Sequence, residues 1–485
     1  MARIVILGAG ISGHTVARYL DKWLSKHDEV MVVSPNSKWN WIPSNIWVGV
    51  GQMSEEEVTF DLAQVYSKTS VRFIQAKALS INPQGNAESA IPFVSVEYTL
   101  PGKVGQQENI TYDYLVNATG PKLNFGATPG LGPEHGHTVS VCTAKHALEA
   151  NEKLQENIAA MRAGANRTIV IGTGHGMCTC QGAAFEYIYN VDHVLREAGV
   201  RDKANIVWLS NEYELGDFGM GGVHIKRGGY ITNGKTFAES LMVERGIKWI
   251  TRAHVTKVEA GKIHYEILDG SQHEQEFDFS MLIPPFAGVG LKAYDQAGAD
   301  ITSQIFAPNG FMKVDADYTP RPYLEWSAKD WPRTYQTPAY RNIFAVGIAF
   351  APPHLISKPM QSANGTPINP APPRTGMPSA AMAKAVAMSI RDMINGADKP
   401  THTASMAEMG AACVASTGAN FFKGTAATMT VFPVVPDFEK YPEYGRDIEL
   451  TFGEIGLAGH WMKYLLHHAF IYQAKLKPGW SLLPD

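Results

Sequence analysis

The segment RIVILGAGISG at residues 3–13 decides the fold. Its first half is an apolar run that predicts a buried strand, and its glycines predict a tight turn that opens a helix. The helical pattern continues to Leu24, and a second strand follows at residues 30–33. In such a unit the glycines let a pyrophosphate approach the helix N-terminus, where free N–H groups favour anions. We therefore expect a dinucleotide-binding domain here.

The second strand runs into Ser34-Pro35-Asn36, without the acid that commonly binds a ribose, so hydroxyl and amide groups are expected to replace it. Two later strand runs, residues 114–120 and 342–347, also end in small residues and resemble flavoprotein strands that abut FAD. The residues expected to contact FAD are Gly8, Gly10, Ile11, Ser12, Gly13, Ser34, Pro35, Pro43, Ala78, Thr119, Gly120, Gly347, Arg374, Thr375 and Gly376.

A second unit of the same kind is predicted from a strand at residues 168–171, the turn GTGHGMCTC at 172–180, a helix around 183–197 and a strand at 205–209. Its ribose acid is also absent, and Ser210-Asn211 stands in that place. Because cysteines crowd this turn, we expect sulfur chemistry there in place of NAD(P) binding.

Length and composition favour a large α/β protein. The chain has 485 residues, 45% of them hydrophobic, and a formal net charge of -4, which gives no general attraction to nucleic acid. We expect no signal peptide, no membrane-spanning helix and no metal site. The fold class is predicted as two Rossmann-like domains: an FAD domain from residues 1–155 and 301–395, a second domain at 156–300, and a C-terminal region at 396–485 with a hairpin and an amphipathic helix.

Three cysteines are predicted beside helix N-termini. Cys142 precedes the expected N-cap Thr143, and Cys178 and Cys180 lie in or next to the first turn of the second helix. That position predicts a lowered thiol pKa, although a free cysteine is more often a small buried hydrophobe. Residues two apart on a helix do not face each other, so only one of Cys178 and Cys180 can point at a given site.

The fourth cysteine, Cys413, is expected in a short strand at residues 411–415. A turn at 416–419 and a strand at 420–422 complete the predicted hairpin. In isolation Cys413 would also be interpreted as a core residue.

Five segments together resemble the sulfide:quinone oxidoreductases, and the likeness covers essentially the whole chain. These segments are residues 39–51, 118–123, 140–147, 180–187 and 408–415. The resemblance implies a monotopic FAD enzyme that oxidises sulfide to zero-valent sulfur or polysulfide and passes the electrons to membrane quinone.

The same resemblance implies that Cys142, Cys180 and Cys413 are the family's three redox cysteines, and it leaves Cys178 without a counterpart. Hydrosulfide would attack a disulfide or sulfur bridge between Cys180 and Cys413, leaving a persulfide on one and a thiolate on the other. Cys413 would then pass two electrons to the flavin. Cys142 would relay or release the polysulfide.

Two side chains in these segments are candidate proton carriers. His146 could hold a thiolate or move protons, and Glu186 could accept a proton if burial raises its pKa. Each could instead be structural. The resemblance also implies a cation beside the flavin at Arg374, where the family has lysine, and it places Asp217 where a family histidine is expected.

The C-terminal helix is predicted to be amphipathic, with Trp461, Leu465, Ala469, Tyr472 and Leu476 on one side and His460, Lys463, His467, His468 and Lys475 on the other. This pattern suits either a core-packed helix or an interfacial anchor, and we favour the anchor. The expected location is the surface of a prokaryotic cell membrane, on a side left open. Quinone would bind beside Phe421 and Phe422.

Three other functions compete with this one. A flavocytochrome-type sulfide dehydrogenase would use a haem acceptor, and a flavin-containing sulfur carrier would turn over little. A type II NADH dehydrogenase is disfavoured by the cysteines and the missing acid. A homo-oligomer is expected.

Overall fold

The N-terminal glycine turn lies at the carboxyl ends of the strands of a mostly parallel sheet. The computed structural model describes residues 1–374 and 376–483. The strand order is β21 (Ile343–Ala345), β8 (Tyr114–Asn117), β1 (Arg3–Leu7), β2 (Glu29–Ser34), β5 (Arg72–Asn82), β6 (Phe93–Tyr98) and β7 (Gln107–Thr111). The strands from β21 to β5 are parallel, whereas β6 and β7 are antiparallel additions. Helices α1 (Ile11–Trp23) and α9 (Gly376–Ile394) pack against each other beside it.

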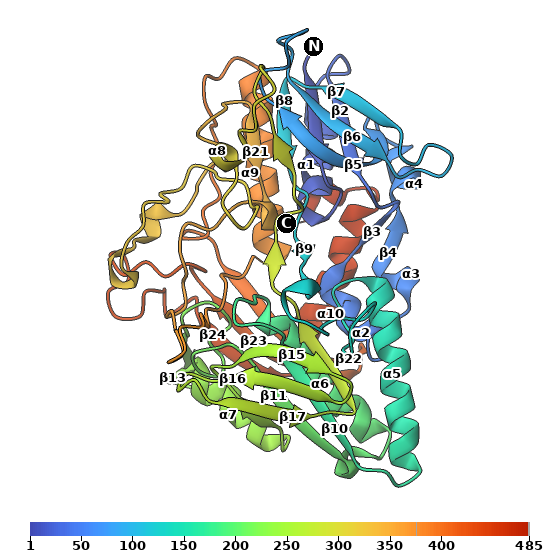
Figure 1. Cartoon of the computed structure of the whole chain (residues 1–485), viewed down its shortest axis with the longest axis vertical. Helices are drawn as coiled ribbons and strands as arrows, with labels where there is room; N and C mark the ends of the chain where they lie inside the picture. Colours follow the sequence, from blue (N-terminus) through green and yellow to red (C-terminus); the bar gives the residue numbers. More distant parts are fainter. Residues whose placement is uncertain (375, 484–485) are drawn as a thin grey trace.

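A second parallel sheet follows in the lower half of Figure 1. Its order is β14 (Lys248–Ile250), β11 (Ala204–Leu209), β10 (Arg167–Thr173) and β18 (Phe279–Ile283). The glycine turn after β10 leads into α6 (Gln181–Glu197), and the other long helices are α5 (Ala144–Arg162) and α7 (Gly234–Glu244). An antiparallel layer of β15 (His254–Glu259), β16 (Lys262–Glu266) and β17 (Gln272–Glu276) adjoins it. The α/β fold class with two Rossmann-type units is therefore confirmed.

The short elements connect these layers. They are β3 (Lys38–Asn40), β4 (Thr59–Asp61), α2 (Asn45–Val48), α3 (Glu55–Val58), α4 (Leu62–Tyr66), β9 (Lys122–Leu123), β19 (Phe286–Ala287), β20 (Lys292–Ala293) and α8 (Thr302–Ile305).

The C-terminal region forms a third sheet, ordered β13 (Tyr230–Asn233), β12 (His224–Arg227), β24 (Phe452–Gly456), β23 (Lys423–Val431) and β22 (Ala411–Asn420). The predicted hairpin exists, but the turn predicted at residues 416–419 is wrong. β22 continues to Asn420 and turns at Phe421-Phe422, because Gly418, with φ of 81°, is absorbed as a bulge between Thr417 and Asn420.

Helix α10 (Leu457–Ala474) has two unlike sides, as predicted. His460, His467 and Gln473 are buried, while Trp461, Met462 and Leu465 are exposed. The buried imidazoles have hydrogen-bond partners: His460 Nδ1 lies 2.6 Å from Ser416 Oγ, and His467 Nδ1 lies 2.9 Å from Ser44 Oγ. Within the described residues, no helix is long and apolar enough to cross a membrane.

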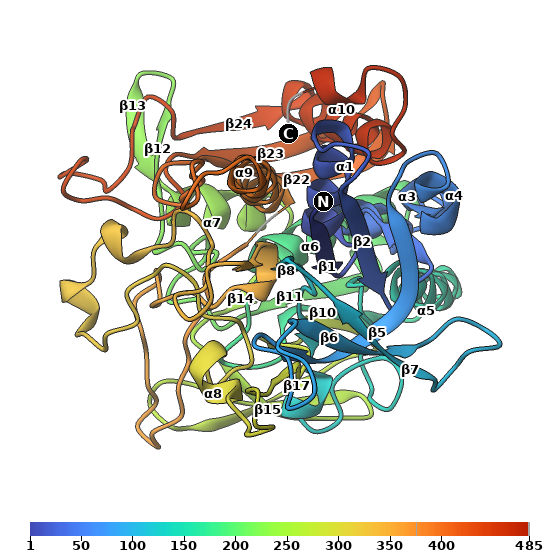
Figure 2. The ribbon, with the colours of Figure 1, turned by 90° about the horizontal axis from the view of Figure 1, so that it is seen from above.

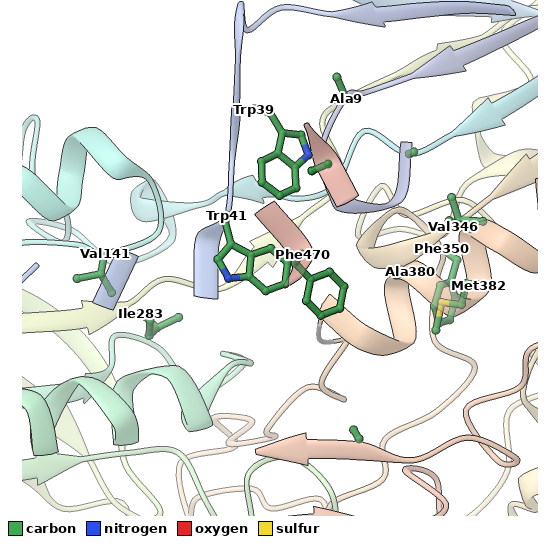
Figure 3. Packing of buried hydrophobic residues seen from close by; sticks show 14 of the residues in the cluster. Ala9, Trp39, Trp41, Val141, Ile283, Val346, Phe350, Ala380, Met382 and Phe470 are labelled. Atoms are coloured by element: carbon green, nitrogen blue, oxygen red, sulfur yellow. The ribbon is translucent and has the colours of Figure 1, made fainter. Parts of the chain in front are cut away.

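The second half of α10 packs on the N-terminal domain that contains the first sheet. Figure 3 shows Phe470 beside Trp41, and their ring centroids are 4.5 Å apart. Near the helix end, the Ala474 carbonyl lies 2.8 Å from Nε2 of the buried His14 in α1. These contacts hold α10 against the same domain whose glycine turn begins the chain.

Candidate active site

The first glycine turn is shaped by two close backbone approaches. A Cβ at Gly8, where φ is 98°, would lie 2.2 Å from the Ala118 carbonyl oxygen, and one at Gly13 would lie 2.0 Å from that of Gly8. Only glycine allows β1, α1 and β8 to pack this closely. A Cβ at Gly10, the N-cap of α1, would meet nothing within 4 Å. Open space therefore faces the free N–H groups of α1, as a pyrophosphate requires.

Other predicted FAD contacts come to the same sheet edge. Ser34 is the last residue of β2, and Thr119 and Gly347 follow the carboxyl ends of the parallel strands β8 and β21. A Cβ at Gly347 would lie 2.3 Å from Ser12 Oγ, so the turn after β21 touches the start of α1. Ligands of open α/β sheets bind at this edge, and the residues present fit FAD.

Helix α9 closes one side of this edge. A Cβ at Gly376 would lie 3.5 Å from Ile11 Cδ1 and 3.6 Å from the Trp41 ring. The buried Arg374 donates from Nη1 to the Ile348 carbonyl at 3.0 Å, and its guanidinium lies 4.6 Å from the Phe311 ring centre. Thr375 lies outside the described residues. Of the remaining predicted contacts, the Pro43 carbonyl accepts a hydrogen bond from Lys463, and Ala78 lies in β5 beyond the stretch that pairs with β2, opposite Val96 of β6.

The second glycine turn is covered by the protein itself. The Gly176 N–H donates to His254 Nδ1 at 3.0 Å, and the Gly176 carbonyl accepts from Asn369 at 2.7 Å. The Cys178 carbonyl likewise accepts from Ala371 at 2.9 Å. A Cβ at Gly176 would lie 2.5 Å from the Pro367 carbonyl oxygen. Residues 367–371 thus fill the place where a second dinucleotide would approach the turn.

All four cysteines are free thiols, and the structure separates their surroundings. Cys178 is fully buried and donates from Sγ to the Ile283 carbonyl of β18 at 3.0 Å. Cys180 is the N-cap of α6, with φ of 65°. Cys413 lies on β22, and a Cβ at Gly182 would lie 2.9 Å from its Sγ. The Cys413 thiol therefore lies against Gly182 in the first turn of α6, two residues after Cys180. The Cys178 thiol instead forms a hydrogen bond with β18.

Burial controls the acidity of these thiols. It raises the pKa of Cys180 and of Cys413 to about 12 and that of Cys142 to about 11, and it raises the pKa of Cys178 as well. The predicted lowering of the thiol pKa at helix N-termini is wrong, since a thiolate in an apolar site loses more solvation than a helix N-terminus returns. At neutral pH the resting thiols are protonated.

Glu186 is buried between β22 and α10. Burial raises its pKa, and the ammonium of Lys463 opposes that shift. Lys463 Nζ lies 2.8 Å from Glu186 Oε2, and Glu186 Oε1 accepts the Ser416 N–H at 3.1 Å. The sequence placed Lys463 on the same side of α10 as His460 and His467, from which it is three and four residues away. The structure turns these three side chains inward.

His146 lies in the first turn of α5. The backbone N–H of His146 donates to Thr143 Oγ1 at 3.1 Å, which confirms Thr143 as the predicted N-cap. Burial lowers the imidazole pKa, and its Nδ1 is buried with no hydrogen-bond partner among the described residues. A neutral imidazole of this kind suits proton transfer better than charge pairing with a thiolate.

Two buried acids follow strand β11. Asp217 accepts from Ser357 Oγ at 2.5 Å, and burial raises its pKa. Glu212, which sequence reasoning missed, accepts from Ser210 Oγ at 2.7 Å and from the Phe218 N–H at 3.0 Å, and burial raises its pKa to about 7. A ribose-binding acid would be expected at Ser210, directly after β11, whereas Glu212 lies two residues further along the chain. The Glu212 side chain is buried.

The hairpin aromatics lie at the surface. Phe422 is 82% exposed, and Phe421 stacks on Trp461 of α10 with ring centres 5.7 Å apart. The indole Nε1 of Trp461 also donates to the Phe421 carbonyl at 2.8 Å. The tip of the β22–β23 hairpin and the start of α10 thus pack together as one unit.

Comparisons with known proteins agree with this geometry. Residues 2–206 match the family model described as pyridine nucleotide-disulphide oxidoreductase. A sulfide-quinone reductase of Aquifex aeolicus is 31% identical over 97% of this chain and 91% of its own length. A solved structure of the sulfide:quinone oxidoreductase from Aquifex aeolicus has a TM-score of 0.74, with 28% identity, 98% of this chain and 92% of that chain covered. NDH2 of Plasmodium falciparum with NADH shares the fold alone, at 12% identity and a TM-score of 0.57, over 88% of this chain and 90% of that one.

Proposed function

This chain belongs to the sulfide:quinone oxidoreductase family, and we propose how its own residues carry out the family's reaction. It is an FAD-dependent oxidoreductase that oxidises sulfide with quinone as the electron acceptor. The observation that carries our residue assignment is the contact of Cys413 Sγ with the first turn of α6, beside Cys180. We assign Cys180 and Cys413 as the redox pair.

In the oxidised enzyme the pair is joined by a disulfide or a sulfur bridge. Hydrosulfide attacks one bridge sulfur, so that one S–S bond forms, another breaks, and a persulfide and a thiolate are left. Closing the bridge again incorporates the added sulfur and releases two electrons and the persulfide proton. FAD, when bound, accepts the electron pair and passes it to quinone. Because the protein thiols have high pKa values, the attacking thiolate comes from the substrate.

Protons leave through the buried pair of Glu186 and Lys463. Glu186 is one of the charges that raise the pKa of Cys413, which places its carboxylate within electrostatic reach of that thiol. Its Oε2 can take the proton released when the bridge closes, and Lys463 Nζ at 2.8 Å stabilises the carboxylate between turnovers. His146 Nδ1 can serve the same purpose beside Cys142, which we assign to polysulfide relay.

Membrane attachment is proposed from the exposed apolar side of α10 and its neighbours. The attachment face is defined by Phe422, Leu457, Trp461, Met462, Leu465 and Leu482, all exposed. Monomeric soluble proteins rarely expose so many large apolar side chains together. Quinone would enter beside Phe421 and Phe422, and the polar inner side of α10 leads from there to Glu186. Polysulfide as product, attachment to a prokaryotic cell membrane and a homo-oligomeric state belong to this proposal.

NADH oxidation is the competing activity, because the fold is shared with NDH2. In the second glycine turn, the Gly176 N–H and the carbonyls of Gly176 and Cys178 are already hydrogen-bonded within the protein, which argues against NADH binding there. The test is anaerobic addition of sulfide or NADH to the purified enzyme while the flavin absorbance is followed. We expect sulfide to bleach the flavin and NADH to leave it unchanged. Bleaching by NADH but not by sulfide would refute the proposal.

A further inference from the structure

The β12–β13 hairpin carries apolar side chains that the proposed activity does not use. Tyr230 is 64% exposed and Ile231 43%, next to the tight turn Gly228-Gly229. Ile225 on the facing strand is buried and would contact a Cβ at Gly453 at 2.8 Å. Ile231 lies on the face of the hairpin opposite Ile225, whereas Tyr230, which pairs with Arg227, lies on the Ile225 face, exposed at the hairpin tip.

The strand register places Ile231 on the same side of the sheet as α10. Ile231 pairs with Lys226, Lys226 with Phe452, and Phe452 with Thr430. Paired residues share a face, and so do residues two apart on one strand. Thr428 marks that face, since its Oγ1 would lie 2.4 Å from a Cβ at Gly459 of α10. Ile231 and the exposed Phe452 thus continue the attachment face beyond the edge of α10.

The arrangement in space agrees with the register. Figure 2 shows the tip of the β12–β13 hairpin and α10 at the same edge of the molecule, with β24 between them. A flat surface that touches the outer side of α10 would meet the hairpin tip as well.

The sequence of this segment combines cations with an aromatic and an aliphatic residue. Residues 218–238 contain Lys226, Arg227 and Lys235 and no aspartate or glutamate, although Asp217 and Glu239 flank them. Lys226 is paired with Glu449 and Lys235 with Glu214. Tyrosine and an aliphatic residue at a hairpin tip, with lysine and arginine close by in the sequence, are the composition of a segment that lies at the lipid headgroup level.

We propose that the β12–β13 hairpin is a second membrane-contact element, which inserts Tyr230 and Ile231 at the lipid headgroup level while α10 forms the first contact. The inference rests on the proposed membrane attachment and specifies a two-point contact. Two points on opposite sides of β24 fix the tilt of the enzyme on the membrane, which one helix cannot do.

The test compares membrane binding of surface variants of the full-length FAD-loaded enzyme. Vesicles of phosphatidylcholine with phosphatidylglycerol, and of phosphatidylcholine alone, are used as probes in sedimentation. The double variant Y230S/I231S is expected to bind mixed vesicles about tenfold more weakly, with a smaller change on neutral vesicles. The control V104S changes a 71% exposed valine in the loop between β6 and β7 and is expected to bind like the wild type.

A second readout does not depend on binding strength. A fluorophore attached at I231C is expected to be quenched by lipids that carry a quencher near the headgroup, and one at V104C is not. If L465S weakens binding while Y230S/I231S does not, and I231C is not quenched, the hairpin inference is overturned and membrane attachment stands. If none of these variants changes binding, attachment itself falls. If Y230S/I231S changes the mass of the enzyme in detergent and not its vesicle binding, the hairpin is an interface between copies, and the inference is wrong.

Discussion

Replacing Gly182 by alanine tests the contact that defines the redox pair. The added Cβ would lie 2.9 Å from Cys413 Sγ, so one of the two must move by roughly 0.5 to 1 Å to restore an ordinary contact. Such overpacking costs about 1–3 kcal/mol, whereas alanine in place of glycine within a helix gains up to about 1 kcal/mol. We expect G182A to destabilise the protein by about 1–2 kcal/mol.

The sign of this effect should depend on the sulfur atom. In a C413A background the clash is absent, and G182A is expected to be neutral or stabilising by up to about 1 kcal/mol. A double-mutant cycle in denaturant unfolding measures this coupling, which we expect at about 1–3 kcal/mol. Displacing the sulfur by such a distance should also slow sulfide-dependent flavin reduction in G182A by about 10- to 100-fold. Equal stability effects of G182A in both backgrounds would show that Cys413 does not lie against Gly182.

Three further predictions follow from the buried groups. K463M leaves Glu186 buried without its cation, so we expect it to lower the free energy of unfolding by about 3–5 kcal/mol and to slow turnover. E186Q keeps a neutral hydrogen-bond acceptor and is expected to cost less. Equal stability of K463M and wild type would contradict the buried pair. C178A should keep sulfide oxidation, with a stability loss of about 1 kcal/mol measured by thermal unfolding, because the Cys178 thiol donates its hydrogen bond to the Ile283 carbonyl and lies away from Cys413. Inactivity of folded C178A would count against the exclusion of Cys178 from the redox pair. Burial lowers the pKa of His14 to about 3, so below pH 6.5 the unfolded chain binds a proton that the native protein does not. The free energy of unfolding should therefore fall by up to about 1.4 kcal/mol per pH unit between pH 6.5 and 3. H14N should reduce that slope in acid unfolding, and an unchanged slope would refute the burial of a neutral His14.

Much of the fold was predictable because local signals coincide with tertiary roles. The segment at residues 3–13 encodes its strand, turn and helix, and the Thr143 cap was evident from its neighbours. The hairpin turn was misplaced because glycine and serine at 416–419 have the composition of a turn, although Gly418 is used as a bulge.

The site was harder to predict where long-range burial decides. The lowered cysteine pKa values followed from helix position alone, while the actual shift comes from residues that cover the thiols in three dimensions. The contacts of the polar side of α10 could not be predicted for a related reason. Its periodicity gave two faces correctly but did not show that Ser44, Ser416 and Glu186, far away in sequence, would bind the polar one.

The role of the Cys180 and Cys413 pair is tested most directly by rapid anaerobic mixing of sulfide with wild type, C178S and C413S while the flavin absorbance is recorded. The account predicts fast bleaching in wild type and C178S, and no bleaching on the turnover timescale in C413S. Bleaching of C413S at the wild-type rate, or its loss in folded C178S alone, would contradict it.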